Sequence, residues 1–179
     1  MFESAFPSFL ITFREALEAT LIVAIVASFL KRVRKQNLNR YLYLGAAAAV
    51  GVSVVLGLAI LAVYGELTGV SAEIFEGTAS LTATLVLTYM ILWMTRHART
   101  IGLELERKVE VAVSNGQLIG IVMLSFVAVF REGLETVLFL TTLVIRDSVG
   151  ATVGLAAASG VVLVPSLLLM RGVYKLDIK

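Results

Sequence analysis

The sequence predicts an all-α membrane protein with five transmembrane helices, arranged as an incomplete inverted repeat of three-helix units. The first reason is composition: 59% of the 179 residues are hydrophobic, 16% are charged and the mean hydropathy is +0.94. Because a soluble domain carries about 25% charged residues, we expect a lipid bilayer around this chain. The second reason is a set of five apolar runs without the alternation of β-strands. The third is a segment near the N-terminus that recurs in the second half of the chain.

Each apolar run is long enough for a helix that crosses the hydrocarbon layer, which takes about 20 residues. No basic segment precedes the first run, so we expect a permanent span rather than a signal peptide. Between the third and fourth runs, residues 100–116 have the pattern of a short amphipathic helix at the membrane surface. The predicted spans, which form a single transmembrane domain, cover residues 7–30, 41–64, 72–94, 117–145 and 150–170.

Basic residues at the ends of the spans predict the orientation of the chain. The positive-inside rule places loops that are rich in lysine and arginine in the cytoplasm. The N-terminus is therefore expected outside and the C-terminus inside, with the cell (plasma) membrane as the expected location. The basic residues follow the first, third and fifth spans: Lys31, Arg32, Arg34, Lys35 and Arg40, then Arg96, Arg99, Arg107 and Lys108, then Arg171, Lys175 and Lys179.

The repeated segment reads SFLITFREALE at residues 8–18 and SFVAVFREGLE at residues 125–135, with seven of eleven positions identical. A weaker match pairs residues 45–52 with 154–161. Because the first and fourth spans start on opposite sides of the membrane, the repeat is inverted, and inverted repeats place a substrate site at their interface near the midplane. The third span has no counterpart before residue 179. We therefore expect that the final helices of the architecture are lacking, or that the chain completes itself as a homo-oligomer.

Both copies of the repeat carry the pattern Arg-Glu-x-x-Glu inside an apolar run, where charges are costly and mark functional sites. Two carboxylates at i and i+3 lie about 60° apart around a helix, so each pair can serve one cation. The arginine lies four residues before the second glutamate and can neutralise it when no metal is bound. A structural role, in which the Arg-Glu pairs lock two helices together, is the alternative. The candidate metal ligands are Glu15, Glu18, Glu132 and Glu135, and their ion-pair partners are Arg14 and Arg131.

The remaining chemistry of the chain narrows the kind of site. Cysteine is absent and His97 is the only histidine, so a cation would take oxygen ligands, which suit hard ions. No nucleophile-base arrangement is evident, so we expect neither an enzyme nor an organic cofactor, and no nucleic-acid partner. Glu73 and Glu76 begin the third span. They are ordinary partners of a helix dipole, or they collect cations at the outer mouth of a pathway.

These motifs resemble the high-affinity iron permease family of fungi and bacteria. The resemblance includes the paired Arg-Glu-x-x-Glu motifs, the segment from Glu73 to Gly77 and the Tyr-Met-x-x-Trp-Met ending at Tyr89 to Met94. It implies that iron is the transported substrate, that Glu15, Glu18, Glu132 and Glu135 bind it, and that Arg14 and Arg131 are their motif partners. It also implies an iron-oxidising or periplasmic redox partner. Family members typically have seven spans, whereas five are predicted here.

Our leading hypothesis is therefore an iron permease that imports iron into the cytoplasm. Iron would be held by carboxylates between the first and fourth spans and released inward by rocking of one repeat against the other. One alternative is a transporter of another metal cation or of protons that uses the same carboxylates. Another is a non-transporting membrane subunit, whose Arg-Glu pairs dock the helices of a partner.

Overall fold

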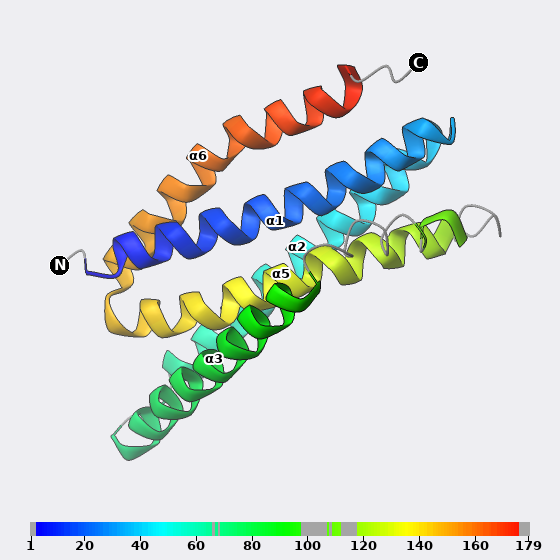
Figure 1. Ribbon diagram of the computed structural model, residues 1–179. Helices are drawn as coiled ribbons and strands as arrows, with labels where there is room; N and C mark the ends of the chain where they lie inside the picture. Colours follow the sequence, from blue (N-terminus) through cyan, green and yellow to red (C-terminus); the bar gives the residue numbers. More distant parts are fainter. Residues whose placement is uncertain are drawn as a thin grey trace.

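The computed structural model describes residues 3–65, 67, 69–97, 107, 109–111 and 118–175 as long helices with short connections (Figure 1). Within these residues there is no strand, so the predicted all-α fold is confirmed. The predicted surface helix at 100–116 lies mostly outside the described residues. The elements are α1 (Ala5–Arg32), the 3-10 turn η1 (Gln36–Leu38), α2 (Asn39–Gly65), α3 (Val70–His97), α5 (Leu118–Arg146) and α6 (Ser148–Lys175).

The five long helices of the described residues contain 27 to 29 residues each. At 1.5 Å per residue they are about 40 Å long, which exceeds the roughly 30 Å of a hydrocarbon layer. Most ends extend beyond the predicted spans, as α1 does through Lys31 and Arg32. The reason is that backbone hydrogen bonding continues into polar flanks, which an apolar run in the sequence does not include.

Two helical stretches of the described chain, Gln36–Gly65 and Ser148–Leu169, are apolar enough to cross a membrane by length and composition. Helices α1 and α5, with 28 and 29 residues, are also long, but unlike these two stretches they carry charged side chains near their centres, at residues 14–18 and 131–135. The crossing of the membrane by all five helices and the inverted repeat remain predictions.

The helices pack as two parallel pairs, α1 with α6 and α2 with α5, and the two pairs run in opposite directions (Figure 1). In the first pair, the Ser8 hydroxyl donates a hydrogen bond of 2.7 Å to the Ala151 carbonyl oxygen. One turn further along α6, a Cβ atom at Gly154 would collide with the Ala5 carbonyl oxygen. A glycine is therefore required for this close approach of the two backbones.

The pair of α2 and α5 uses the same kind of contact. The Ser125 hydroxyl donates a hydrogen bond of 2.7 Å to the Leu42 carbonyl oxygen. A Cβ atom at Gly45 would collide with the carbonyl oxygen of Val122. The repeated segments of the sequence align Ser8 with Ser125 and Gly45 with Gly154. The same serine-carbonyl and glycine contacts thus occur in both pairs, and each pair combines one helix from each copy of the repeat.

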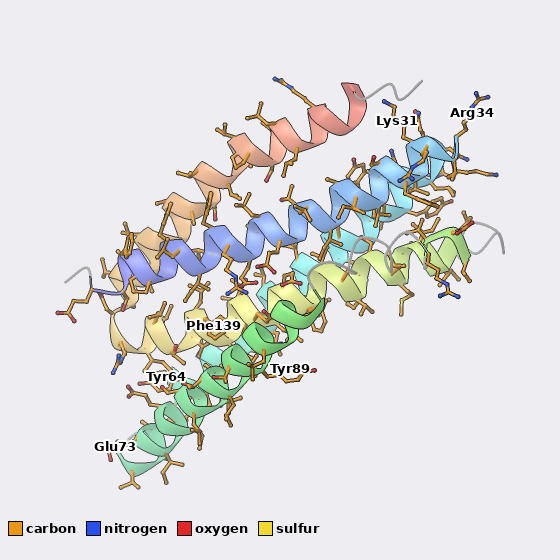
Figure 2. The ribbon with its side chains drawn as sticks, in the orientation of Figure 1. Lys31, Arg34, Tyr64, Glu73, Tyr89 and Phe139 are labelled. Carbon is orange, nitrogen blue, oxygen red and sulfur yellow. The ribbon has the colours of Figure 1, made fainter. Side chains whose placement is uncertain are left out.

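The two ends of the helix bundle differ in charge. Lys31 and Arg34 lie at the end where α1 meets α2, whereas Glu73 lies at the opposite end, in the first turn of α3 (Figure 2). The Asp147 carboxylate, between α5 and α6, accepts a hydrogen bond of 2.9 Å from the Gly150 backbone N–H, which lowers the pKa of Asp147. Asp147 thus stays ionised and caps the start of α6.

Replacing Gly45 by alanine is expected to lower the melting temperature of the purified protein, because the added methyl group would force α2 away from α5. Overpacking of this kind costs about 1–3 kcal/mol. The matched control is Gly51→Ala in the same helix, where a Cβ atom would meet nothing within 4 Å. That control should be neutral or stabilising by about 0.5–1 kcal/mol, because alanine favours a helix over glycine. Equal melting temperatures for the two variants would contradict the close packing of α2 on α5.

Candidate metal centre

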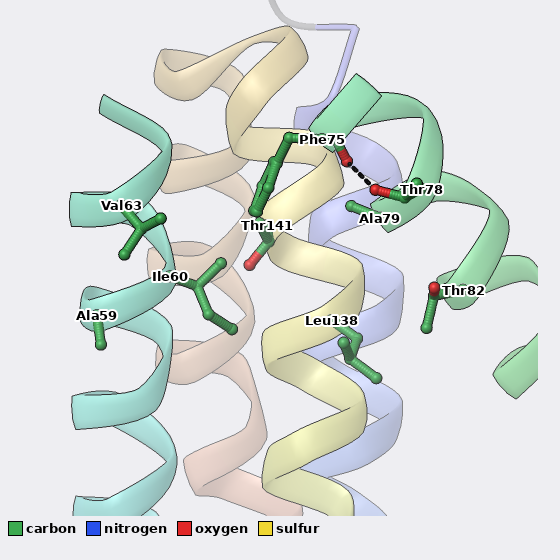
Figure 3. A pocket seen from close by; sticks show the side chains of 9 residues that line it. All are labelled: Ala59, Ile60, Val63, Phe75, Thr78, Ala79, Thr82, Leu138 and Thr141. Atoms are coloured by element: carbon green, nitrogen blue, oxygen red, sulfur yellow. Dashed lines mark hydrogen bonds between the residues drawn. The ribbon is translucent and has the colours of Figure 1, made fainter. Parts of the chain in front are cut away.

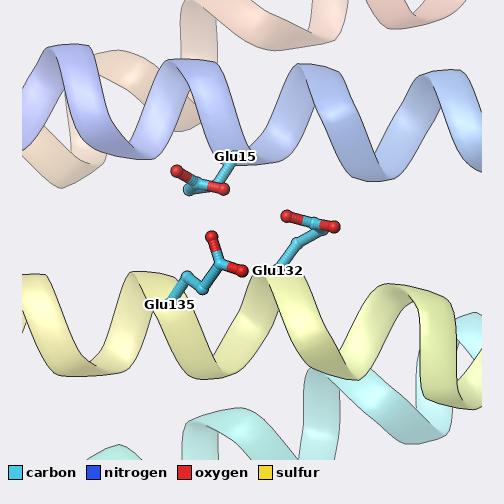
Figure 4. Close-up of side chains that lie close together, drawn as sticks. All are labelled: Glu15, Glu132 and Glu135. Carbon is cyan, nitrogen blue, oxygen red and sulfur yellow. The ribbon is translucent and has the colours of Figure 1, made fainter. Parts of the chain in front are cut away.

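Three of the predicted carboxylates meet in the centre of the molecule, where α1 and α5 run side by side in opposite directions. Glu15 comes from α1, and Glu132 and Glu135 come from one turn of α5. Their side chains point toward one another across the space between the two helices (Figure 4). One oxygen from each residue can be chosen so that all three lie within 4.8 Å of one another. We call these three residues the carboxylate cluster.

The carboxylate cluster is buried, with exposed fractions of 1% for Glu15, 5% for Glu132 and 6% for Glu135. Among the described residues, four of its oxygens have no hydrogen-bond partner: both of Glu15, Oε2 of Glu132 and Oε2 of Glu135. A buried polar group without a partner costs about 1–3 kcal/mol, and more if it is charged. Such groups call for an explanation, and a cation that binds between them is one that fits all four oxygens.

The separation of the oxygens suits a hard cation after a small adjustment. Calcium-like ions bind oxygen at about 2.3–2.6 Å and smaller ions at about 2.0–2.1 Å. Two oxygens on opposite sides of one ion are therefore about 4–5 Å apart, which is close to the 4.8 Å limit of the carboxylate cluster. A slight inward movement of the side chains would bring all three residues into one coordination shell.

Two arginines offset part of the negative charge. The Arg14 Nε group donates to Glu18 at 2.9 Å, and an NH group of Arg14 lies 3.5 Å from Glu15. The Arg131 Nε group donates to Glu135 at 3.2 Å. Both pairs that the sequence spacing indicated, four residues apart on one helix, are therefore formed. Each arginine leaves at least one oxygen of its neighbouring cluster carboxylate without a hydrogen bond.

Glu18 is the predicted ligand that the structure does not bring into the cluster. Its side chain is 26% exposed and is held by Arg14. It remains close enough to interact electrostatically with Glu15, Glu132 and Glu135. The i, i+3 spacing of Glu15 and Glu18 is therefore not sufficient to place both side chains in one group, because Glu18 is bonded to Arg14 and partly exposed.

Glu73 and Glu76 do not join the carboxylate cluster. Both lie near the start of α3, and the Glu73 side chain is at the far end of that helix (Figure 2). They remain candidates for collecting cations at the outer mouth of a pathway, which is the role considered for them from the sequence.

A cavity of about 410 Å³ lies elsewhere, between α2, α3 and α5 (Figure 3). No charged side chain lines it, and two of its hydroxyl groups already donate to backbone carbonyls, Thr78 to Ile74 and Thr141 to Val137. Its lining offers no charge to a cation, so we place the candidate metal centre at the carboxylate cluster.

Sequence reasoning overlooked one polar residue beside the cluster, Thr12 on α1. It is only 6% exposed, and its hydroxyl has no hydrogen-bond partner among the described residues. Its spacing, three residues before Glu15, was the available signal. That signal is weak alone, because threonines in membrane helices usually bond to their own backbone.

Long apolar helices with ionisable side chains buried between two of them are typical of a membrane protein that has a functional site within the membrane. Comparison with known families identifies the kind of membrane protein. Residues 5–179 match the profile of the iron permease FTR1 family, and the chain belongs to that family. Permeases are transporters, so the prediction that this chain is not an enzyme is confirmed.

Several curated proteins are similar to this chain. An uncharacterised protein of Archaeoglobus fulgidus is 37% identical over 169 residues, which covers 94% of this chain and 59% of that protein. The ferrous iron permease EfeU of Escherichia coli O6:K15:H31 is 38% identical over 160 residues, covering 86% of this chain and 58% of EfeU. The ferrous iron permease EfeU of Yersinia pseudotuberculosis is 37% identical, covering 84% and 54%. This chain thus spans between half and three fifths of the length of these relatives. No solved structure matches it significantly.

Replacing Glu15 by glutamine is expected to raise the melting temperature of the metal-free protein. The change removes one negative charge from the buried cluster, and the glutamine amide can donate to a neighbouring carboxylate. The expected gain is about 1 kcal/mol, measured by thermal unfolding in detergent with a chelator present. Glu73→Gln, at an exposed position, should change stability by less than about 0.5 kcal/mol. A loss of stability in Glu15→Gln would instead support a structural ion pair with Arg14.

Proposed function

We propose that this chain forms the iron-binding core of a permease that carries iron across the cell membrane into the cytoplasm. The observation that carries the proposal is the carboxylate cluster, in which buried oxygens from both Arg-Glu-x-x-Glu motifs lack hydrogen-bond partners within the described chain. Family membership supports iron as the substrate. The names of the relatives specify ferrous iron for those proteins.

The chemistry of the cluster is consistent with this substrate. The sequence has no cysteine, so the ligands must be oxygens or the single histidine. Three carboxylates carry a formal charge of −3, which a divalent or trivalent cation offsets more fully than a monovalent ion. Oxygen ligands suit hard cations of this charge. Another hard metal cation would satisfy the same ligands, so competition between metals is part of the test.

The distribution of charge supports the proposed orientation of the chain, with the basic end in the cytoplasm. The basic end of the bundle contains Lys31 and Arg34, and the acidic first turn of α3 lies at the other end. By the positive-inside rule the basic end faces the cytoplasm. Iron would then approach from the end that contains Glu73 and leave toward the end that contains Lys31. A redox partner at the outer face remains part of the proposal through the family resemblance alone, and a homo-oligomer remains only an expectation from the sequence.

The helix contacts favour a particular division into moving parts. Hydroxyl-carbonyl bonds and glycine contacts join α1 to α6 and α5 to α2, whereas α1 meets α5 at the charged cluster. Close backbone packing resists sliding, so each pair would move as a unit. We therefore propose that the pair α1–α6 rocks against the pair α2–α5, rather than one sequence repeat against the other. Such a movement would open the carboxylate cluster to either side in turn.

Glu132→Gln and Glu15→Gln should each lower iron uptake at least tenfold in cells that lack other iron importers, because each removes a charged ligand. Glu3→Gln, near the exposed N-terminal end, is the matched control and should leave uptake unchanged. Uptake is measured with radioactive iron at equal amounts of protein in the membrane. Full uptake by both cluster variants would refute the assignment of the site. If manganese or lead competes for the site more strongly than unlabelled iron does, the transported ion is another cation. If the pure protein contains no metal and co-purifies with a partner protein, a docking subunit is favoured.

A disulfide between α1 and α6 should leave iron uptake intact if these helices move together. The chain has no native cysteine, so Thr20→Cys with Ser166→Cys introduces one pair, at positions where the two hydroxyl oxygens are 3.0 Å apart. Each single cysteine variant is the control. If one repeat moved against the other, the same disulfide would lock the transporter, and uptake would fall on oxidation and recover with a reducing agent.

A further inference from the structure

Thr12 differs from other threonines of α1 and α5 in the bonding of its hydroxyl group. Thr20, Thr136 and Thr141 each donate to the carbonyl oxygen four residues earlier, as is common within a membrane helix. The Thr12 hydroxyl makes no hydrogen bond to any described residue, although the side chain is as deeply buried as that of Thr141. The Thr12 hydroxyl therefore remains available for a partner that is neither its own backbone nor a neighbouring helix.

The position of Thr12 relates it to the carboxylate cluster. It lies three residues before Glu15, which on a helix corresponds to about 60° around the axis and about 4.5 Å along it. Ser8, Thr12 and Glu15 form a buried line along α1. Helix α5 runs in the opposite direction to α1. The step back from Glu15 to Thr12 on α1 and the step forward from Glu132 to Glu135 on α5 therefore lead toward the same end of the bundle. In the proposed orientation this is the outer side of the cluster.

The repeat offers an internal comparison at this position. The aligned segments 8–18 and 125–135 place Val129 opposite Thr12, one turn before Glu132. Val129 is 4% exposed, so it fills an equally buried place with an apolar side chain of nearly the same shape. Packing in this position therefore does not require a hydroxyl group. The oxygen at Thr12 needs a different explanation.

We propose that the Thr12 hydroxyl is a neutral oxygen ligand that receives the cation on the outer side of the carboxylate cluster. A hydroxyl group can give a lone pair to a cation while its own proton is donated to a carboxylate oxygen. Oxygens of the cluster without partners are available to accept that proton. This inference rests on the proposed function of the cluster and adds a fourth residue to its ligands.

The test compares metal binding by Thr12→Val, Thr12→Ser and Thr141→Val in the complete protein, purified in detergent. Thr141 is the matched control, because it has the same 6% exposure but its hydroxyl already donates to Val137. The probe is ferrous iron under anaerobic conditions, with manganese(II) in a second series. Thr12→Val should bind roughly tenfold more weakly, whereas Thr12→Ser and Thr141→Val should stay within about twofold of the unmodified protein. Equal melting temperatures would show that Thr12→Val is folded, as Val129 leads us to expect.

The outcomes separate this inference from the function on which it rests. Binding by Thr12→Val equal to that of the unmodified protein, together with loss of binding in Glu132→Gln, overturns the role of Thr12 and leaves the cluster in place. Binding that is unaffected by Glu132→Gln overturns the proposed site itself. If Thr12→Val does not fold, Thr12→Ala replaces it, and normal iron binding by that variant also overturns the inference.

Discussion

Repulsion between like charges that are held away from water is the constraint on which this structure depends. Glu15, Glu132 and Glu135 come from two antiparallel helices and would separate if the helices could slide or turn freely. Arg14 and Arg131 offset part of the charge, each through a hydrogen bond to a glutamate of its own helix, and Arg14 also attracts Glu135 across the space between α1 and α5. Further restraint comes from packing between the two helix pairs, in which α1 also contacts α2 and α5 also contacts α6. Within each pair, hydroxyl-carbonyl bonds hold α1 to α6 and α5 to α2.

Much of this arrangement follows from the sequence, because its signals are local and periodic. Long apolar runs give helices, and the spacing in Arg-Glu-x-x-Glu places an arginine beside the glutamate four residues later, as α1 and α5 both show. The separation of Glu18 from the other carboxylates depends instead on how two helices cross. Likewise, the partnership of α1 with α6 depends on contacts such as Ser8 with Ala151, which are 143 residues apart. No local pattern specifies either feature.

The cavity between α2, α3 and α5 shows why volume alone is a poor guide to this kind of site. Its walls are mostly apolar, and the hydroxyls of Thr78 and Thr141 already donate to carbonyl oxygens of their own helices. The carboxylate cluster, by contrast, contains four buried oxygens without a hydrogen-bond partner among the described residues. For a cation, the decisive property is the number of oxygens that converge within about 2–2.6 Å of one point. A compact group of side chains can meet this condition where a large hollow cannot.

Departures from the internal repeat also bear on the direction of transport. If both copies were identical, the cluster would present the same ligands to both sides of the membrane. The two copies differ at Thr12 and Val129, and the side chains of their second glutamates, taken without the backbone, differ in exposed fraction, 26% for Glu18 against 8% for Glu135. In the proposed permease, these differences would give a cation different affinities on the two sides and so set the order in which it meets its ligands. They cannot by themselves drive net import, because a binding site shifts an equilibrium only by its differential affinity for two states. Net import therefore requires a gradient or a chemical step that removes iron on one side, and the asymmetric ligands determine how well the site uses it.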